Sequence, residues 1–377
     1  MGKITPASHC VAIDTFVLTA QGPRQVYELL GKSVTLIVDG KPFLTRGRGF
    51  FKTGKSPIFR LETEEGFAVS LTEDHPVLRV VSSARSGARA EWTETGNVNP
   101  GERLLLHNHR HFWNWPGEYG EAEGYLTGLL LGEGTFKQDT SAASVWVPTG
   151  SQLFVDEPAK RATPDQKGQP ESLVVPPAPN ESRLFLGHVK EMALRLAILP
   201  KERSITPALE KCSSDFYRGF LRGLFDCDGS VQGTQKKGVS IRLPRKDVHF
   251  LQALQRMLLR LGMVGRIAEE HRPDGTMSSE EDGEQKSSSG KIRYELLITN
   301  NNVQYFDQIV GFANPVKQAR LKQLLTSYKR ILNRERFTVT VKGLLPQSIE
   351  DVYGVRVPGV NAFDANGFYV HNGGWVL

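Results

Sequence analysis

The sequence has few cysteines and no long apolar run. Among its 377 residues, Cys10, Cys212 and Cys227 are too few and too scattered for a disulfide framework or a Cys-x-x-Cys metal site, so a functional cysteine would act as a free thiol. No apolar stretch approaches the roughly 18 residues of a membrane-spanning helix. The first residues, MGKITPASHC, lack the apolar core of a secretory signal. These absences predict a cytoplasmic protein that does not enter a membrane.

The composition fits two or three folded domains. Hydrophobic residues make up 39% of the chain, which suits globular cores, and domains usually take roughly 100–200 residues each. The net charge is +6 and the pI is about 9.1. Such a charge permits a nucleic-acid partner, although an ordinary basic surface gives the same numbers.

Both ends of the chain have the pattern of β structure. Between Cys10 and about Leu106, short strands alternate with turns, and residues 58–62 and 67–71 form the alternating pattern of a half-buried hairpin. Strands are predicted again after Arg336, at 337–341, 352–357 and 367–370. A β beginning and a β ending indicate one domain interrupted by another.

The middle of the chain has a mixed α/β pattern. Apolar residues at helical spacing predict helices over 121–136, 189–199, 215–227, 247–261 and 318–330. Strands are predicted at 239–243 and 294–299. The stretches 158–179 and 269–291 are rich in loop-forming residues, and we expect poor order there.

Three blocks at the two ends contain residues suited to peptide-bond rearrangement. CVAIDTFVLTAQGPRQVYEL opens with Cys10, GFAVSLTEDHPVL contains Thr72 and His75, and VPGVNAFDANGFYVHN ends with His371 and Asn372. In this order, the blocks resemble the Hint (hedgehog/intein) splicing family. The resemblance implies an all-β, horseshoe-like splicing domain that uses no cofactor.

The resemblance assigns a role to each residue. The thiol of Cys10 would accept the acyl group of the preceding residue, His75 would give a proton to the departing nitrogen, and Thr72 would hold the peptide. The side chain of Asn372 would cyclise onto its own carbonyl, with His371 as the neighbouring acid or base. Singly, Cys10 fits a small buried apolar residue, His75 a core histidine and the last pair a polar chain end. Together, and in this order, they favour splicing.

The sequence departs from the family at three positions. Gly373 follows Asn372 where the family places Cys, Ser or Thr to accept the acyl chain. Gly354 stands where relatives usually carry Asp, and Asn361 where many carry His; Asp364 or His371 can compensate for these two. Glycine offers no side-chain nucleophile, so we expect that the chain does not join its two flanks.

Two segments in the middle resemble the signature helices of LAGLIDADG endonucleases. They are EGYLTGLLLGEGTF and YRGFLRGLFDCDGSV, and the resemblance extends over about 120–336. It places Glu133 and Asp228, 95 residues apart, in the same slot of two repeats. It also implies an α+β fold of two αββαββα halves related by a pseudo-twofold axis. Small residues one helical turn apart, such as Gly128 and Gly132, allow the two helices to approach closely.

The implied chemistry is metal-dependent cleavage of both DNA strands at a specific site. Two carboxylates at one point, Glu133 and Asp228, suit Mg²⁺. The family carries a lysine near each metal site, commonly in K-x-I-P; here Arg203 begins the corresponding RSITP, and Lys201 lies close by, so both are candidates for the basic role. Candidates for DNA contact are basic residues that follow Asp228, namely Lys236, Lys237, Arg242, Arg245 and Lys246. A solvated basic hairpin explains any one of these equally well.

A run of alternating histidines, His107-Asn-His109-Arg-His111, has the look of a metal cluster. It lies at a domain junction without acidic or cysteine ligands, and we do not assign it a metal.

We therefore expect flanking remnants of a host protein at 1–9 and 373–377, a splicing domain at 10–119 and 337–372, and an endonuclease at 120–336. The expected partners of this monomer are the flanking exteins in cis and double-stranded DNA of the intein-free host gene. One alternative is a splicing element whose endonuclease has decayed to a DNA-binding or inert domain. Another is a hedgehog-like autoprocessor that releases one flank to an external nucleophile, which the terminal Asn372 disfavours.

Overall fold

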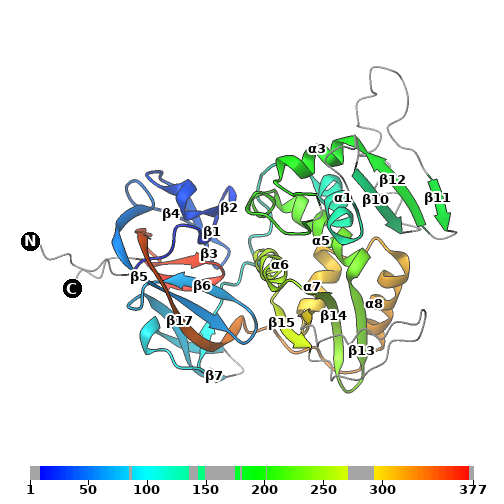
Figure 1. The fold of residues 1–377 in the computed structure, drawn as a ribbon. Coiled ribbons are helices and arrows are strands. Elements are labelled where there is room, and N and C mark those ends of the chain that lie inside the picture. Colours follow the sequence, from blue (N-terminus) through cyan, green and yellow to red (C-terminus); the bar gives the residue numbers. More distant parts are fainter. Residues whose placement is uncertain are drawn as a thin grey trace, which may run out of the picture.

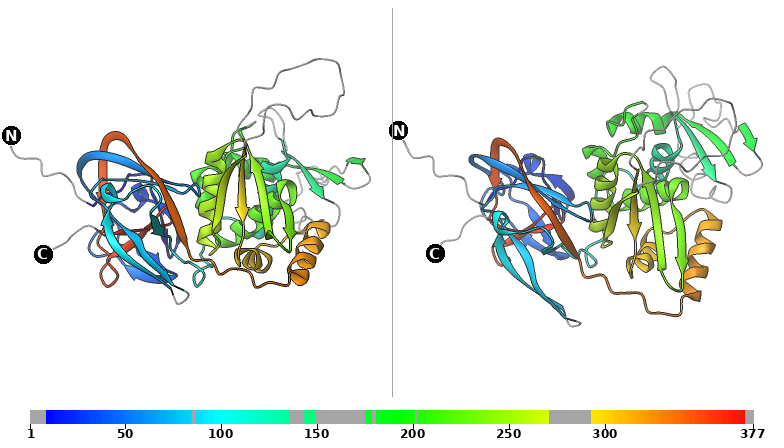
Figure 2. Two further views of the ribbon diagram at one scale, coloured as in Figure 1. Left: turned by 90° about the horizontal axis from the view of Figure 1, so that it is seen from below. Right: turned by 60° about the horizontal axis from the view of Figure 1, so that its bottom comes forward.

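The computed structural model describes residues 9–84, 87–135, 143–148, 175–178, 181–200, 202–270 and 293–372. They form two lobes, here called the β lobe (9–106 and 337–372) and the α/β lobe (120–335) (Figure 1). The blue beginning and the red end of the chain share the β lobe, and two further views keep the lobes side by side (Figure 2). None of the described helices is long and apolar enough to cross a membrane.

The β lobe contains two antiparallel sheets. The smaller has the order β2-β1-β3-β4 and the larger the order β18-β19-β7-β9-β17-β5-β6, with β8 paired to β7. The strands of the smaller sheet are β1 Phe16–Thr19, β2 Gly22–Gln25, β3 Thr35–Val38 and β4 Lys41–Leu44. Those of the larger are β5 Phe51–Thr63, β6 Ala68–Leu71, β7 Pro76–Ala84, β8 Gly87–Glu94, β9 Arg103–Leu105, β17 Thr338–Gly354, β18 Ala362–Ala365 and β19 Phe368–His371. Short 3₁₀ turns lie at Val26–Leu29 and Thr95–Asn97.

The two ends of the sequence complete one core. Strand β17 pairs with β5 from Val341 opposite Thr63 to Gly354 opposite Phe51. Buried apolar residues of both segments pack in one cluster, among them Val11, Leu61, Val69, Val339, Phe363 and Phe368. Strands of the two segments alternate in the larger sheet, so the sheet and its core are complete only when both segments are present. The prediction of a single β domain built from both ends is confirmed.

The α/β lobe is built from two halves. The second half runs α5-β13-β14-α6-β15-β16-α7, the αββαββα order expected. Its elements are α5 Ser214–Asp228, β13 Ser230–Thr234, β14 Gly238–Arg245, α6 Val248–Arg260, β15 Gly265–Glu270, β16 Arg293–Ile298 and α7 Asn302–Ile309, followed by α8 Pro315–Ser327. The first half includes α1 Glu121–Gly132, β10 Ala143–Pro148, β11 Val175–Ala178, β12 Glu181–Leu186, α3 Gly187–Arg195 and α4 Pro207–Glu210. The strands form sheets of order β10-β12-β11 and β13-β14-β16-β15.

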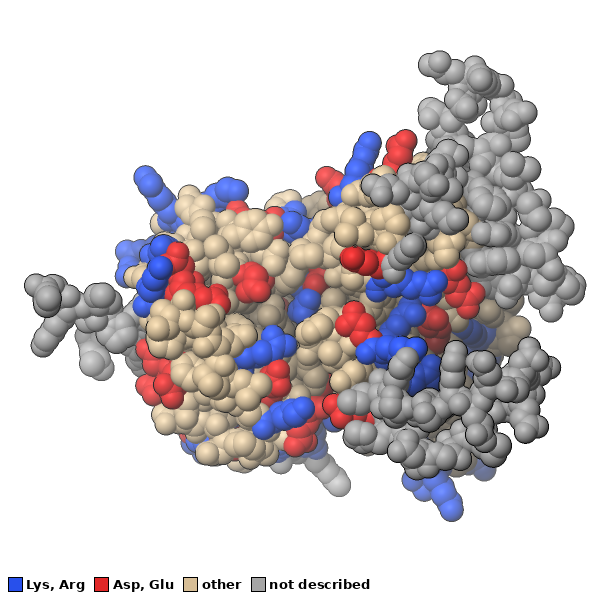
Figure 3. Space-filling view, in the orientation of Figure 1, with Lys and Arg blue, Asp and Glu red and all other residues tan. Residues whose placement is uncertain are grey.

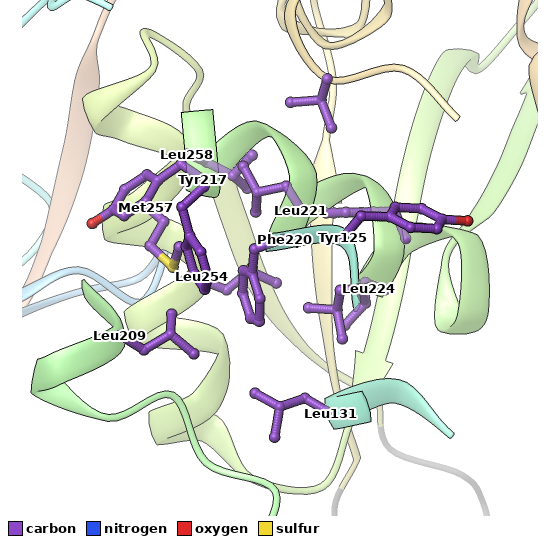
Figure 4. Close-up of a cluster of buried hydrophobic side chains, with 14 of the residues drawn as sticks. Tyr125, Leu131, Leu209, Tyr217, Phe220, Leu221, Leu224, Leu254, Met257 and Leu258 are labelled. Atoms are coloured by element: carbon purple, nitrogen blue, oxygen red, sulfur yellow. The ribbon is translucent and has the colours of Figure 1, made fainter. Parts of the chain in front are cut away.

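Helices α1 and α5 pack with their backbones close together. A Cβ at Gly128 would collide with the carbonyl oxygen of Phe220, and one at Gly223 with that of Tyr125. Glycine has no Cβ, so these positions permit the close approach. Around this contact lies an apolar core that α6 also supplies (Figure 4), and it includes Phe220, Leu224 and Leu254.

The structure corrects several predicted boundaries. Helix α1 ends at Gly132 rather than at 136, since Gly134 follows and Thr135 turns to pair with Ser144. The C-terminal β segment contains one long strand, β17, where two were predicted, because β5 supplies a partner along its length. Helices α4 and α7 are short, and no helical pattern predicted their positions, although the family order implied a helix after β16. Strand β11 lies within 158–179 and β15 reaches Glu270; the remaining parts of both expected loops lie outside the described residues.

The lobes meet at the tip of the β5–β6 hairpin. The carbonyl oxygen of Glu65 accepts hydrogen bonds from Ile267 N at 2.9 Å and Gln255 Nε2 at 2.7 Å. Gln252 Nε2 donates to the carbonyl oxygen of Gly66 at 3.1 Å. A Cβ on Gly66, whose φ is 96°, would come within 2.9 Å of Ile267, so the tip fits closely against the α/β lobe.

Candidate functional site

Cys10 and Thr72 are joined by a pair of hydrogen bonds. The backbone nitrogen of Cys10 donates to Thr72 Oγ1 at 3.2 Å, and Thr72 N donates to the carbonyl oxygen of Cys10 at 3.0 Å. Thr72 follows strand β6 directly, so the β5–β6 hairpin positions it. Thr72 thus contacts the nitrogen of the bond that splicing would break, as a residue that holds the peptide should.

The ring of His75 lies between the two ends of the chain. Its Nδ1 is 3.0 Å from the carbonyl oxygen of Cys10, and its Nε2 is 3.0 Å from the carbonyl oxygen of His371. Sequence reasoning placed His75 at the Cys10 nitrogen; the structure gives that contact to Thr72 and places His75 on the carbonyl. The Thr72-x-x-His75 turn explains this arrangement, since His75 N donates to Thr72 O and so orients the ring past Thr72.

Burial governs the protonation of this site. It lowers the pKa of His75 to about 4, although hydrogen bonds to the carbonyls of Cys10 and His371 partly oppose the shift. Burial also raises the pKa of the Cys10 thiol to about 11, with Asp74 adding to the rise and the hydroxyl of Thr53 opposing it. Near neutral pH, His75 is therefore uncharged and Cys10 is a thiol.

The residue before Cys10 has a strained backbone. His9 has a φ of 58°, in the left-handed region that few non-glycine residues adopt. Its backbone nitrogen donates to Asp74 Oδ1 at 3.4 Å. The conformation costs on the order of 1–2 kcal/mol, and it lies next to the peptide bond between His9 and Cys10.

Asn372 is buried and held at two points. Its backbone nitrogen donates to the carbonyl oxygen of Asn361 at 3.1 Å, and its Nδ2 donates to that of Val357 at 3.3 Å. The preceding His371 packs against Trp92, with ring centroids 5.0 Å apart, and burial lowers its pKa. Asn361 therefore holds Asn372 through its backbone carbonyl. The contacts of Trp92 and Val357 were not predicted, because no sequence motif marks either residue.

Asp364, proposed as a compensating residue, lies in a different cluster. One carboxylate oxygen lies 2.8 Å from His109 Nε2, and the other accepts from Gly367 N at 2.5 Å. Successive residues of a strand point to opposite faces, so Phe363 packs against His75 while Asp364 points the other way. The structure thus corrects the assignment: Asp364 anchors His109. Burial raises the pKa of Asp364, but the hydrogen bond to His109 and the nearby His107 outweigh burial and lower it.

The two acidic residues of the repeated motif lie at adjoining helix ends. Glu133 directly follows α1, and Asp228 ends α5. A Cβ on Gly132 would lie 2.6 Å from Cβ of Cys227 and 3.4 Å from Asp228 Oδ2, which shows how closely the two ends approach. The charges of both carboxylates raise the pKa of Cys227, and they oppose the lowering of the pKa of Lys317. The helix contact thus brings Glu133 and Asp228 to one place, as the motif predicts.

Three cations surround these acids. Arg245 Nη2 lies 2.6 Å from Asp228 Oδ2, and Arg203 donates to the carbonyl oxygen of Gly132. Lys317 Nζ donates to the last carbonyls of α5, including that of Asp226 at 2.5 Å. Burial lowers the pKa of Lys317, while the neighbouring acids oppose the shift. Sequence reasoning missed Lys317, because nothing local shows that a lysine at the start of α8 reaches the end of another helix.

The predicted DNA-contacting residues do not share one environment. Side chains alternate between the two faces of β14, and Arg245 lies on the same face as the buried Val239, Ile241 and Leu243. It therefore points to Asp228 rather than to the outer face of the sheet. Arg242 points outward and pairs with Glu295 at 2.9 Å. Lys236, Lys237 and Lys246 are exposed, and Lys201 lies outside the described residues. Acidic and basic side chains are interspersed on the face shown in Figure 3.

The carboxylates of Glu133 and Asp228 are the kind of ligand that a hard divalent cation prefers, but two carboxylates are too few to fill its coordination shell. Two carboxylates are the ligands that Mg²⁺ prefers. Within the described part of the chain, no three His, Cys, Asp or Glu side chains are grouped to hold a metal ion. A cation would therefore need further oxygen ligands from water or phosphate.

Comparison with known proteins supports the assignment of the α/β lobe. Residues 215–311 match the family model described as a LAGLIDADG-like domain. The NrdEB alpha subunit of ribonucleoside-diphosphate reductase from Bacillus subtilis is 20% identical over 100% of this chain and 37% of its own length. A DNA polymerase of Thermococcus litoralis is 24% identical over 90% of this chain and 20% of its own. The chain thus spans about a third or less of these two relatives.

Two solved structures resemble the chain weakly. A G-1F mutant of the Ssp DnaB mini-intein variant M86 covers 97% of this chain and 98% of its own, with 9% identity and a TM-score of 0.29. A mesophilic variant of the homing endonuclease I-DmoI covers 50% of this chain and 96% of its own, with 17% identity and a TM-score of 0.29. Both TM-scores are low, so the assignment depends on the motifs, the strand order and the matched family. The family match assigns residues 215–311 to a LAGLIDADG-like domain, and the β lobe that this domain interrupts contains the three blocks that resemble the Hint family.

Proposed function

We propose that the chain rearranges its own peptide bonds at Cys10 and Asn372. The observation that carries this proposal is the ring of His75, which contacts the carbonyl oxygens of Cys10 and His371 at 3.0 Å each. Acyl transfer between two junctions requires them to lie within bonding reach. A purely structural role for a buried histidine would not explain why its ring contacts both of these residues.

At the first junction, Sγ of Cys10 attacks the carbonyl carbon of His9. The bond from that carbon to the nitrogen of Cys10 breaks, the nitrogen gains a proton, and the thiol loses one. Thr72 Oγ1 holds the nitrogen, and the left-handed backbone of His9 favours breaking the bond because strain is released. His75 is the titratable side chain in contact with Cys10.

At the second junction, Nδ2 of Asn372 attacks the carbonyl carbon of the same residue. A cyclic imide forms, and the bond to Gly373 breaks as the new amine gains a proton. His371 is the neighbouring acid or base. The carbonyl oxygen of Val357 accepts a hydrogen bond from Nδ2 and holds the attacking group in place. Because Gly373 has no nucleophilic side chain, cleavage at either end is possible while joining of 1–9 to 373–377 is not.

The test is the mass of the purified chain with and without a thiol. A thiol should release 1–9 through attack on the thioester at Cys10, and slow cyclisation of Asn372 should release 373–377. A chain whose mass is unchanged under both conditions, with Cys10 free and the protein folded, would contradict the proposal.

We further propose that the α/β lobe is a site-specific DNA endonuclease that uses Glu133 and Asp228. The contact of α1 and α5 brings these acids together, and their repulsion favours a bound divalent cation. When bound, Mg²⁺ would activate water and stabilise the leaving oxygen of the phosphodiester. Lys317 and Arg203 provide positive charge beside the acids. Lys236, Lys237, Lys246 and Arg242 would contact DNA of the intein-free host gene.

One observation favours the alternative of a decayed nuclease. Arg245 occupies Oδ2 of Asp228 at 2.6 Å, where a cation would have to bind. A nicking assay on DNA that carries the intein-free junction, with and without Mg²⁺, separates the two functions. Cleavage of both strands only with Mg²⁺ supports the nuclease; salt-sensitive binding without cleavage supports the decayed domain.

The proposed organisation follows from these functions. The splicing domain comprises 10–119 and 337–372, the endonuclease 120–336, and the exteins 1–9 and 373–377. Each active centre is formed within one chain, which suits a monomer.

A further inference from the structure

The thiol of Cys10 lies against a hydroxyl group that no motif in the sequence singles out. Thr53 Oγ1, on β5, is 2.9 Å from Cys10 Sγ. The same hydroxyl donates to the carbonyl oxygen of Val352 at 3.0 Å. Since its hydrogen is directed to Val352, its lone pairs are available to accept the hydrogen of the thiol.

The two side chains differ in exposure. Cys10 is fully buried and clusters with Ile58 and Val352, whereas Thr53 is exposed. The buried thiol thus forms its hydrogen bond with a residue that reaches the protein surface. Gly354 flanks it closely, since a Cβ there would lie 3.3 Å from Cγ2 of Thr53. The glycine leaves room for the threonine methyl group beside the thiol.

An apolar pocket makes the thiol reluctant to ionise, because burial disfavours the charged form. The acyl shift nevertheless needs the sulfur as a nucleophile, and the thiolate is the nucleophilic form. A neighbouring hydroxyl can stabilise that form by turning its hydrogen toward the sulfur.

We propose that Thr53 is a catalytic residue of the first junction, which accepts a hydrogen bond from the Cys10 thiol and donates one to the sulfur as it ionises. The thiol proton leaves to a solvent base, hydroxide or a buffer anion, and the hydroxyl hydrogen turns from Val352 O to Sγ. The sulfur then attacks the carbonyl carbon of His9. This inference rests on the acyl shift proposed above.

The test compares Thr53→Val, which removes the hydroxyl and keeps the shape, with Thr53→Ser, which keeps the hydroxyl. Thr63→Val is the matched control, because Thr63 lies on the same strand and its hydroxyl also donates to a backbone carbonyl, that of Phe67. The first measurement is alkylation of Cys10 by iodoacetamide between pH 7 and 10.5, quantified for the Cys10 peptide by mass spectrometry. The second is release of 1–9 by dithiothreitol.

Loss of a hydrogen bond to a charged group predicts that Thr53→Val slows both reactions about tenfold at pH 8. Below the thiol pKa of about 11, a one-unit rise in that pKa and a loss of access both lower the rate equally at every pH, so Thr53→Ser, which keeps the hydroxyl, separates the two. Thr53→Ser should stay within about threefold of the parent, and Thr63→Val should match it.

Two results would overturn the inference in different ways. Parental rates in Thr53→Val would exclude the role of Thr53 while leaving the acyl shift in place. No release of 1–9 from the parent chain, although alkylation still depends on Thr53, would remove the acyl shift and with it any catalytic role.

Discussion

The Nε2 atom of His75 lies 3.0 Å from the carbonyl oxygen of His371, a residue 296 positions further along the chain. The other ring nitrogen contacts the carbonyl oxygen of Cys10. Because burial lowers the pKa of His75 to about 4, the ring carries a single N–H hydrogen at neutral pH and can donate to only one of the two carbonyls at a time. One side chain therefore links the geometry of both junctions.

Replacing His75 with Ala should slow both cleavages together, by at least about 100-fold each, since general acid–base groups contribute on this scale. Asn372→Ala should block only the release of 373–377. His107→Gln, which removes a buried histidine that directly follows residue 106 and stacks on Tyr369 of the β lobe, should leave both rates within about threefold. Time courses of the released peptides, followed by mass spectrometry, give all three rates. An unchanged C-terminal rate in His75→Ala would show that the contact with His371 has no functional weight.

Replacing Gly373 with Cys or Ser should allow the chain to join 1–9 to 373–377. The acyl group then has a side-chain nucleophile to receive it, while Thr72, His75 and His371 remain in place. The ligated peptide is detected by its mass. If the parent chain with Gly373 already forms that peptide, the proposed route is wrong.

The β lobe, together with His107 that stacks on its Tyr369, should lose stability as the pH falls from about 6.5 to 4. Burial lowers the pKa of His75 and of His107 to about 4 each, so the unfolded chain binds protons in this range that the folded chain does not. The stability that the uncharged histidines contribute is fully present above their pKa in the unfolded chain, which is about 6.5. At pH 5, each histidine should lower the free energy of unfolding by about 2 kcal/mol.

Urea unfolding at pH 7 and pH 5 measures this loss, and His107→Gln should remove roughly half of it. A variant that loses as much stability as the parent between these two pH values would contradict the assignment to His107.

If the endonuclease is active, Asp228→Asn should abolish Mg²⁺-dependent cutting and leave DNA affinity within about threefold. The asparagine keeps the shape but loses the charge that favours a divalent cation. Asp215→Asn, an exposed acid on the same helix, is the control and should cut normally. Binding should weaken at least about tenfold between 50 and 200 mM salt, because it depends on phosphate contacts. Full cutting by Asp228→Asn would place the active site elsewhere.

Replacing Gly128 with Val should destabilise the α/β lobe by about 3 kcal/mol or more. The new side chain would collide with the backbone of α5 at Phe220, which cannot move aside as a flexible side chain would. At Gly343 in β17 a Cβ would meet no atom within 4 Å, so Gly343→Ala is the matched control. Urea midpoints of the two variants and the parent provide the comparison. Equal midpoints for Gly128→Val and the parent would show that the helices are not in contact as described.

The sequence by itself determined the division into a β domain and an inserted α/β domain. Apolar residues recur every second residue in a strand and every three to four residues in a helix, and these repeats are visible in short stretches of sequence. The hairpin around Glu65 and the helices α5 and α6 were predicted within a few residues for this reason. The choice of Cys10, His75, His371 and Asn372 as candidates also followed from sequence, since their order in three blocks is itself informative, and the structure brings His75 to the carbonyl oxygens of Cys10 and His371. The position of the short helix α7 and the unbroken course of β17 did not follow from the sequence pattern, because tertiary partners stabilise them.

Only the tertiary structure decided which groups touch. In the tertiary structure, the backbone nitrogen of Cys10 contacts Thr72 and its carbonyl oxygen contacts His75. Asp364 pairs with His109, and Arg245 pairs with Asp228. The tertiary structure also brought Lys317 and Thr53 to reactive groups far away in sequence. The physical reason is that a residue type limits what a side chain can do, whereas strand parity, register and helix contact decide where it points. Those depend on partners that no local pattern specifies.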